Sequence, residues 1–289
     1  KNGSFLWQLL SEAKVNKPNE KLVIAIDALD EVIGVTNQED SPINILYLPS
    51  NLSEGVYFIM TLRRLKKQTL TVADNVSKSI FDLMEYQEQN LEDARLFVRQ
   101  EVTKKDEEGS LEREELLEWI EKRSLTVEDF VNTLTEQSKG NFIYLVFILN
   151  SIENGFYDET NIETIPKNLR DYYDSLCQRV GMFSGLLRYT KAQIVYILSE
   201  TNNPIPYEEI VEIIKYTEVQ NPELIVDEVL DVWIQILRHQ QLYGQDFYSP
   251  YHHTYRDFLR DNQTVKRAGV TLKGIKKLIA DSMDLYGDS

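Results

Sequence analysis

Cysteine and histidine are scarce in this chain: its 289 residues include one cysteine, Cys177, and three histidines. One cysteine cannot form an internal disulfide, and a zinc site built from cysteine or histidine needs more ligands than these. Low cysteine usage is typical of a reducing compartment, so the sequence predicts a cytoplasmic protein. Glycine (12 residues) and proline (8) are also few, which excludes collagen-like and low-complexity chains.

Long apolar runs and an excess of basic residues are missing as well. The longest purely apolar run, 142–149, is far shorter than a membrane-spanning helix, and no signal-peptide pattern is visible. The 31 Lys+Arg face 47 Asp+Glu, a formal charge of −16, which disfavours nucleic acid and anionic membranes at long range. The sequence therefore predicts no nucleic-acid partner and no membrane partner. A local phosphate site is compatible with this charge, because a helix N-terminus or one arginine can supply it.

The order of apolar patterns predicts an α/β protein with a long helical part. Two continuous apolar runs, 22–26 and 56–60, are typical of buried parallel strands covered on both faces. Helical periodicity dominates after them. We expect three parts: the distal part of an α/β domain over 1–85, a helical domain over 86–160, and a winged-helix-like domain with a C-terminal helix over 161–289.

Local signals add finer expectations. Residues 4–15 read as a helix, and residues 43–52 have room for a short one. Asn90 is expected to cap a helix, and Thr126 another, with Asp129 completing a capping box. Pro166 is expected in the first turn of a further helix. Residues 243–248 predict a short hairpin or wing, and 272–285 a last helix.

The pattern with most chemical content follows the first apolar run. Asp27 ends that run, and Asp30 and Glu31 come just beyond it. A carboxylate at the carboxyl edge of a parallel sheet lies where ligands bind in open α/β folds, and Mg²⁺ prefers such oxygen ligands. Asp30 or Glu31 would then orient or activate a water. The alternative is a strand end followed by a solvated acidic loop.

This segment, Ile26-Asp27-Ala28-Leu29-Asp30-Glu31, resembles the Walker B motif of NACHT-type STAND P-loop NTPases. The second run with its extension, Phe58-Ile59-Met60-Thr61-Leu62-Arg63, resembles the sensor-1 segment of that family, although Leu62 replaces a small polar residue. The resemblance implies that Asp27 holds Mg²⁺ and that Arg63 contacts the γ-phosphate, where a guanidinium can bind two oxygens. Arg64 competes for the role of Arg63.

Four later segments extend the resemblance in the order of the family. Residues 251–259 resemble the winged-helix segment in which a histidine faces the β-phosphate of bound ADP, and His252 matches that histidine. The alternative for His252 is a structural role. Residues 138–145, 165–180 and 278–287 are similar to a helix start, a helix and a C-terminal helix common in these proteins.

A P-loop motif, G-x-x-x-x-G-K-[ST], does not occur in the sequence. In the family it precedes Walker B, so we expect this chain to be a fragment that binds nucleotide weakly and hydrolyses it negligibly. The resemblance implies ATP/ADP and Mg²⁺ as cofactors of an ATPase switch, self-oligomerisation through the NTPase domain, and effector or sensor domains on the same polypeptide. The alternative is a non-enzymatic scaffold with a degenerate nucleotide site. A DNA-binding wing is disfavoured, because residues 243–261 hold no basic cluster.

Overall fold

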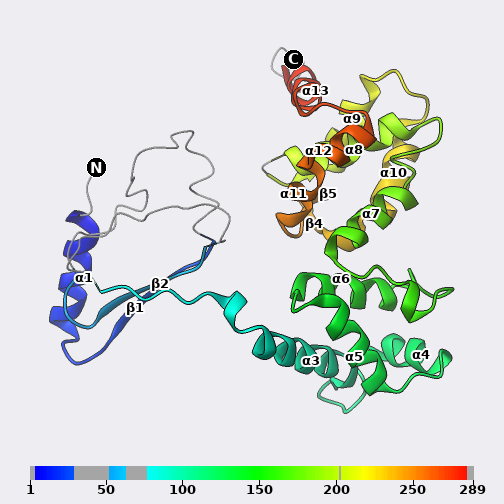
Figure 1. The fold of residues 1–289 in the computed structure, drawn as a ribbon. Coiled ribbons are helices and arrows are strands. Elements are labelled where there is room, and N and C mark those ends of the chain that lie inside the picture. Colours follow the sequence, from blue (N-terminus) through cyan, green and yellow to red (C-terminus); the bar gives the residue numbers. More distant parts are fainter. Residues whose placement is uncertain (1–3, 29–51, 63–76, 202, 285–289) are drawn as a thin grey trace. The chain divides into compact units, whose positions relative to one another are not determined.

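The computed structural model describes residues 4–28, 52–62, 77–201 and 203–284. The chain divides into two compact units, Lys1–Asp82 (unit 1) and Leu83–Ser289 (unit 2), and each is described by itself (Figure 1). The described residues form an α/β structure that is mostly helical, with one parallel and one antiparallel sheet. Within those ranges, no helix is long and apolar enough to cross a membrane.

Unit 1 contains helix α1 (Ser4–Asn16) and two strands, β1 (Leu22–Ile26) and β2 (Val56–Met60). The strands pair in parallel with no stagger, so that Leu22 lies opposite Val56 and Ile26 opposite Met60. The helix and both strands predicted from the sequence are therefore confirmed. The short helix expected over 43–52 falls almost wholly outside the described residues.

The burial of this sheet differs from the expectation. Val56 is buried and Ile24 is half-buried, whereas the opposite face exposes Val23 (51%), Tyr57 (49%) and Ile59 (59%). Over the described residues, the sheet thus has one partly buried face and one exposed face, unlike the expected sheet with both faces covered. The described part of unit 1 has one helix, and a single helix cannot cover both faces of a sheet.

The first half of unit 2 is a group of four helices. These are α3 (Gln87–Thr103), α4 (Glu114–Lys122), α5 (Val127–Ser138) and α6 (Phe142–Glu153), preceded by a 3-10 turn, η1 (Leu83–Glu85). Ala94, Val98, Phe130, Leu134 and Ile148 are among their fully buried side chains. The apolar positions of these helices thus form the core that the sequence periodicity predicts.

The start of α3 corrects one prediction. Asn90 does not cap the helix, which begins three residues earlier at Gln87. The Asn90 side chain instead donates a hydrogen bond from Nδ2 to the Leu83 carbonyl oxygen at 2.8 Å. Gln87 to Gln89 are good helix formers, so the helix extends back until it meets η1.

The caps of α5 and α6 follow the sequence closely. Thr126 accepts from the Asp129 amide at 3.0 Å while the Asp129 carboxylate accepts from the Thr126 amide, which confirms the predicted capping box. Lys139 (φ 50°) and Gly140 (φ 78°) then adopt the left-handed conformation that ends α5. Asn141 caps α6 by accepting from the Tyr144 amide at 3.1 Å.

The second half of unit 2 begins with α7 (Leu169–Arg179), after a 3-10 turn, η2 (Ile162–Thr164). Pro166 was expected in its first turn, but the helix is capped by Asn168, whose side chain accepts from the Asp171 amide at 2.9 Å. Asparagine is a preferred N-cap residue, so the helix begins after Asn168 and Pro166 lies before it.

The following elements alternate helices with short strands. They are α8 (Arg188–Glu200), β3 (Ile205–Pro206), α9 (Tyr207–Lys215), α10 (Pro222–Trp233), η3 (Ile234–Ile236), β4 (Leu237–Leu242) and β5 (Gln245–Pro250). The antiparallel sheet has the order β3-β5-β4, with Leu242 opposite Gln245 at the hairpin end. Tyr243 (φ 54°) and Gly244 (φ 80°) make the two-residue turn between β4 and β5. The predicted hairpin is confirmed, and it is longer than expected.

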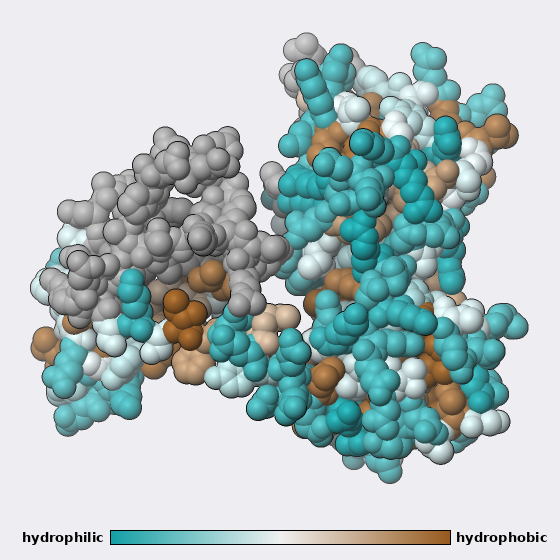
Figure 2. All heavy atoms as spheres, viewed as in Figure 1, coloured by the Kyte–Doolittle hydropathy of each residue, from teal (hydrophilic) through white to brown (hydrophobic). Residues whose placement is uncertain are grey.

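Three helices complete unit 2: α11 (Thr254–Arg260), α12 (Asn262–Ala268) and α13 (Leu272–Asp284). Buried apolar residues from Ala94 to Ile275 form one continuous core, so both halves of unit 2 share it. Figure 2 shows that the visible face of unit 2, drawn on the right, is mostly hydrophilic. That surface agrees with the strongly charged composition of the chain.

Candidate functional site

Asp27 and Thr61 lie side by side at the carboxyl end of the parallel sheet. Each directly follows its strand, and the last residues of those strands, Ile26 and Met60, are opposite each other. The pairing continues one step further, because the Thr61 amide donates to the Ile26 carbonyl oxygen at 3.0 Å. The strand register thus places a carboxylate and a hydroxyl together at the edge where open α/β folds bind ligands.

The Thr61 hydroxyl joins the two strand ends. Its Oγ1 accepts a hydrogen bond from the Ala28 amide at 2.9 Å and donates a short one to Asp27 Oδ1. Ala28 has φ 52°, a left-handed conformation that costs an alanine roughly 1–2 kcal/mol. The hydrogen bond from Ala28 helps to stabilise this conformation, and together the two contacts fix where the Asp27 carboxylate lies.

This donor set fits a hard cation such as Mg²⁺. Mg²⁺ takes oxygen ligands and is usually held by one or two carboxylates, with waters and substrate phosphates supplying the rest. The described residues contain no group of three histidine, cysteine or acidic side chains that could hold a metal. Among the described residues, Asp27 supplies the carboxylate at this edge, and sites with few protein carboxylates share the cation with a phosphate ligand.

Thr61 is the residue that sequence reasoning missed as a site residue. The segment 58–63 was singled out, but its role was assigned to Arg63. The available signal was the register: two apolar runs of equal length that pair without stagger bring their following residues together. Asp30, Glu31, Arg63 and Arg64 lie outside the described residues.

His252, the other candidate, lies in unit 2 between β5 and α11, whereas Asp27 belongs to unit 1. The His252 Nδ1 lies 2.9 Å from Thr254 Oγ1 and accepts from the Thr254 amide at 3.3 Å. The His252 ring also packs on that of His253, with centroids 3.9 Å apart. The residue is half-buried, and these contacts come from its own chain segment.

Buried aromatic side chains hold the helix that follows His252. Tyr255 donates to the Val195 carbonyl oxygen at 2.7 Å and packs on Trp233, with centroids 5.1 Å apart. Tyr173 packs on Phe258 at 5.4 Å. Burial raises the pKa of Tyr173 and of Tyr255 well above that of an exposed tyrosine, so both phenols stay protonated and keep a proton to donate. Helix α11 is therefore fixed against α7, α8 and α10.

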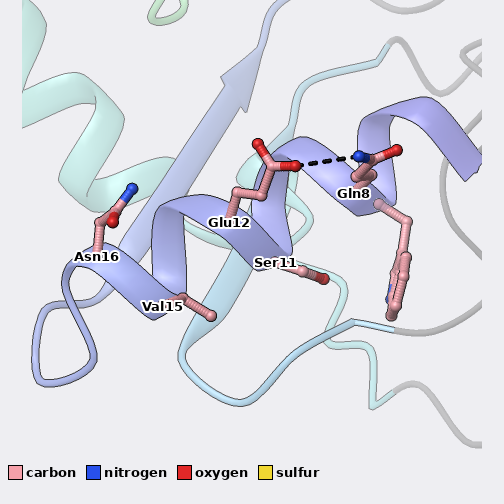
Figure 3. Close-up of a pocket in the computed structure, with 6 residues that line it drawn as sticks. Gln8, Ser11, Glu12, Val15 and Asn16 are labelled. Carbon is pink, nitrogen blue, oxygen red and sulfur yellow. Dashed lines mark hydrogen bonds between the residues drawn. The ribbon is translucent and has the colours of Figure 1, made fainter.

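A hollow of about 300 Å³ runs along one side of α1 (Figure 3). Its residues lie at helical spacing on that one element and are Trp7, Gln8, Ser11, Glu12, Val15 and Asn16. The Gln8 side chain donates to Glu12 Oε1 at 3.0 Å across its rim. This hollow is the surface of a single helix and includes none of the predicted site residues.

The chain matches no protein-family model, no curated protein and no solved structure. The sequence motifs, the contacts at Asp27 and the arrangement around His252 are therefore the features of the chain that indicate a function.

Proposed function

We propose that this chain is part of a STAND-type, ATP/ADP-dependent switch with a P-loop NTPase domain. The observation that carries the proposal is the contact between Asp27 and Thr61 at the carboxyl edge of two parallel strands. A Walker B carboxylate occupies such an edge, and a hydroxyl donor on the neighbouring strand keeps it in position for a cation.

In this function Asp27 holds Mg²⁺, which neutralises charge on the nucleotide phosphates. Thr61 orients the Asp27 carboxylate through the hydrogen bond described above. Asp30 or Glu31 positions the attacking water, and Arg63 contacts the γ-phosphate. The roles of these last three residues come from the resemblance alone.

The topology of unit 2 supports the same proposal. Its order α8-β3-α9-α10-β4-β5 and its sheet order β3-β5-β4 are those of a winged helix. His252 follows β5 by two residues, as expected if it contacts the β-phosphate of ADP in a closed state. Exchange of ADP for ATP would shift the population to an open state, which self-associates and activates effector domains on the same polypeptide.

A non-enzymatic scaffold is the second candidate. The Asp27 side chain is exposed, as expected of a strand end followed by a solvated acidic loop. A scaffold does not need Mg²⁺-dependent chemistry at Asp27, so the two candidates differ in what Asp27 does.

The test is ATP hydrolysis by the protein encoded by the gene's entire reading frame. We expect Mg²⁺-dependent hydrolysis that Asp27→Asn reduces by about a hundredfold or more, the range for losing an electrostatic stabiliser of the transition state. Glu54→Gln is the matched control, since it also neutralises one exposed carboxylate of unit 1 but lies before β2, at the opposite end of that strand. Equal rates for both variants, or no hydrolysis by wild type, would favour the scaffold.

A further inference from the structure

Two hydroxyl groups form a chain that ends on His252. The Tyr173 hydroxyl, on α7, lies 2.9 Å from Thr254 Oγ1, and Thr254 Oγ1 lies 2.9 Å from His252 Nδ1. Tyr173 is 1% exposed, so its hydroxyl has left water and needs a partner inside the protein. The chain therefore connects a core residue to the half-buried imidazole.

The direction of these hydrogen bonds follows from the backbone. The Thr254 amide donates to His252 Nδ1 at 3.3 Å, so Nδ1 presents a lone pair and carries no proton. Thr254 Oγ1, next to the same nitrogen, then donates to it as well. Because that hydroxyl has one proton, it must accept from Tyr173, whose buried phenol is a donor. Tyr173 therefore donates to Thr254, and Thr254 donates to His252 Nδ1.

We propose that Tyr173 and Thr254 are positioning residues for His252, which they hold as the neutral imidazole with its proton on Nε2. In the proposed function His252 contacts a nucleotide phosphate, and Tyr173 and Thr254 would fix the ring that makes this contact. That step rests on the proposed function; the assignment of tautomer and orientation does not. Since Tyr173 belongs to α7 and Thr254 to α11, the arrangement also makes the orientation of His252 depend on how these helices pack.

The tautomer can be measured in the chain itself by nitrogen NMR with ¹⁵N-labelled histidine. The sequence holds three histidines, and the variants His239→Gln and His253→Gln identify the signals of His252. At a pH where the imidazole is neutral, we expect the His252 Nδ1 signal of an unprotonated acceptor and the Nε2 signal of a protonated nitrogen.

Three variants test the positioning roles. Thr254→Val removes the hydroxyl at nearly constant shape, and Tyr173→Phe removes the phenol while keeping the ring that packs on Phe258. We expect Thr254→Val to raise the Nδ1–H population of His252 at least twofold over wild type and Tyr173→Phe to raise it less, whereas Thr254→Ser restores the wild-type spectrum. A proton on Nδ1 in wild type, or equal tautomer populations in wild type and Thr254→Val, would overturn the proposal.

Two controls keep the outcome interpretable. The near-ultraviolet circular dichroism of each variant reports whether the aromatic cluster is still packed, and Tyr173→Phe is the milder variant if Thr254→Val does not fold. The spectra need no nucleotide, so this proposal and the proposed function can fail independently. A chain that has the expected His252 tautomer but binds no nucleotide would support this proposal and contradict the proposed function.

Discussion

At the scale of single residues, the hydroxyl of Thr61 connects the ends of the two strands of unit 1. It satisfies the Ala28 amide and restrains the Asp27 carboxylate at the same time. Two apolar runs of equal length indicate that Asp27 and Thr61 meet, but the hydrogen bonds themselves could not be read from the sequence, because residues 34 positions apart meet only through strand pairing. The position of Asp27 at a strand end, by contrast, followed directly from the apolar run that it ends.

The variant Thr61→Val tests this role, because valine keeps the shape and removes both hydrogen bonds. We expect a loss of about 1–2 kcal/mol in the stability of unit 1, since each of the two hydrogen bonds contributes roughly 1 kcal/mol or less, and faster hydrogen exchange of the Ala28 amide. Amide exchange measured by NMR checks this, and Thr61→Ser should restore protection. If exchange at Ala28 were unchanged in Thr61→Val, the hydroxyl would not be its partner.

At the scale of elements, caps and periodicity predicted most helices of unit 2 and failed at particular places. The capping box at Thr126 and the stop at Gly140 are local, and local signals are reliable where no tertiary contact competes. The predictions at Asn90 and Pro166 were wrong. The side chain of Asn90 binds a carbonyl of the preceding turn, and Asn168 provides a better cap than proline. One face of the described sheet of unit 1 is exposed although both were expected to be covered. The apolar pattern of a strand does not say which helices pack on it.

Glu200, at the end of α8, ties that helix to two later ones. Its side chain is 1% exposed, binds Arg260 of α11 with both oxygens at 2.8 Å, and lies 3.7 Å from Lys276 of α13. Burial opposes its ionisation, but the hydrogen bond from Arg260 and the charges of Arg260, Lys276 and Arg256 outweigh it and hold the pKa of Glu200 below its usual value. The contacts therefore stabilise the ionised form.

A pH dependence follows from this lowered pKa. The stabilisation is fully present above about pH 4.3, the ordinary glutamate pKa in the unfolded chain, and is lost as the pH falls through the lower folded-state pKa. We expect Glu200→Gln to cost about 2 kcal/mol near neutral pH and much less in acid. The measurement is urea unfolding of the wild type and of Glu200→Gln from acid to neutral pH. Glu212→Gln, which removes an exposed pair with Lys215, should cost well under 1 kcal/mol; an equal cost for both variants would contradict the account.

At the scale of the whole molecule, the described parts of the two units differ in how much core they have. Unit 2 shares one continuous core, whereas the described sheet of unit 1 has two strands and an exposed apolar face. Two strands alone are marginally stable, so unit 1 is expected to open more readily. The residues on either side of the boundary also expose large apolar side chains: Ile80 (92%), Phe81 (77%), Leu83 (71%) and Met84 (59%).

Limited digestion with chymotrypsin tests this division. Phe81, Leu83 and Met84 are side chains that the protease prefers, and they are accessible. We expect a resistant fragment that begins between residues 82 and 85 and contains the rest of unit 2, identified by mass spectrometry. Early cleavage inside α5 or α8, before this fragment accumulates, would contradict a common core in unit 2.

The central claim, that Asp27 belongs to a nucleotide site, is tested most directly by the nucleotide content of the protein purified from its entire reading frame. The protein is denatured and the released small molecules are separated by chromatography. The account predicts close to one ADP or ATP per chain in wild type and in Glu54→Gln, and a large loss in Asp27→Asn when Mg²⁺ is present. A wild-type protein that carries no nucleotide, and takes up none from a Mg²⁺–ATP solution, would contradict the claim.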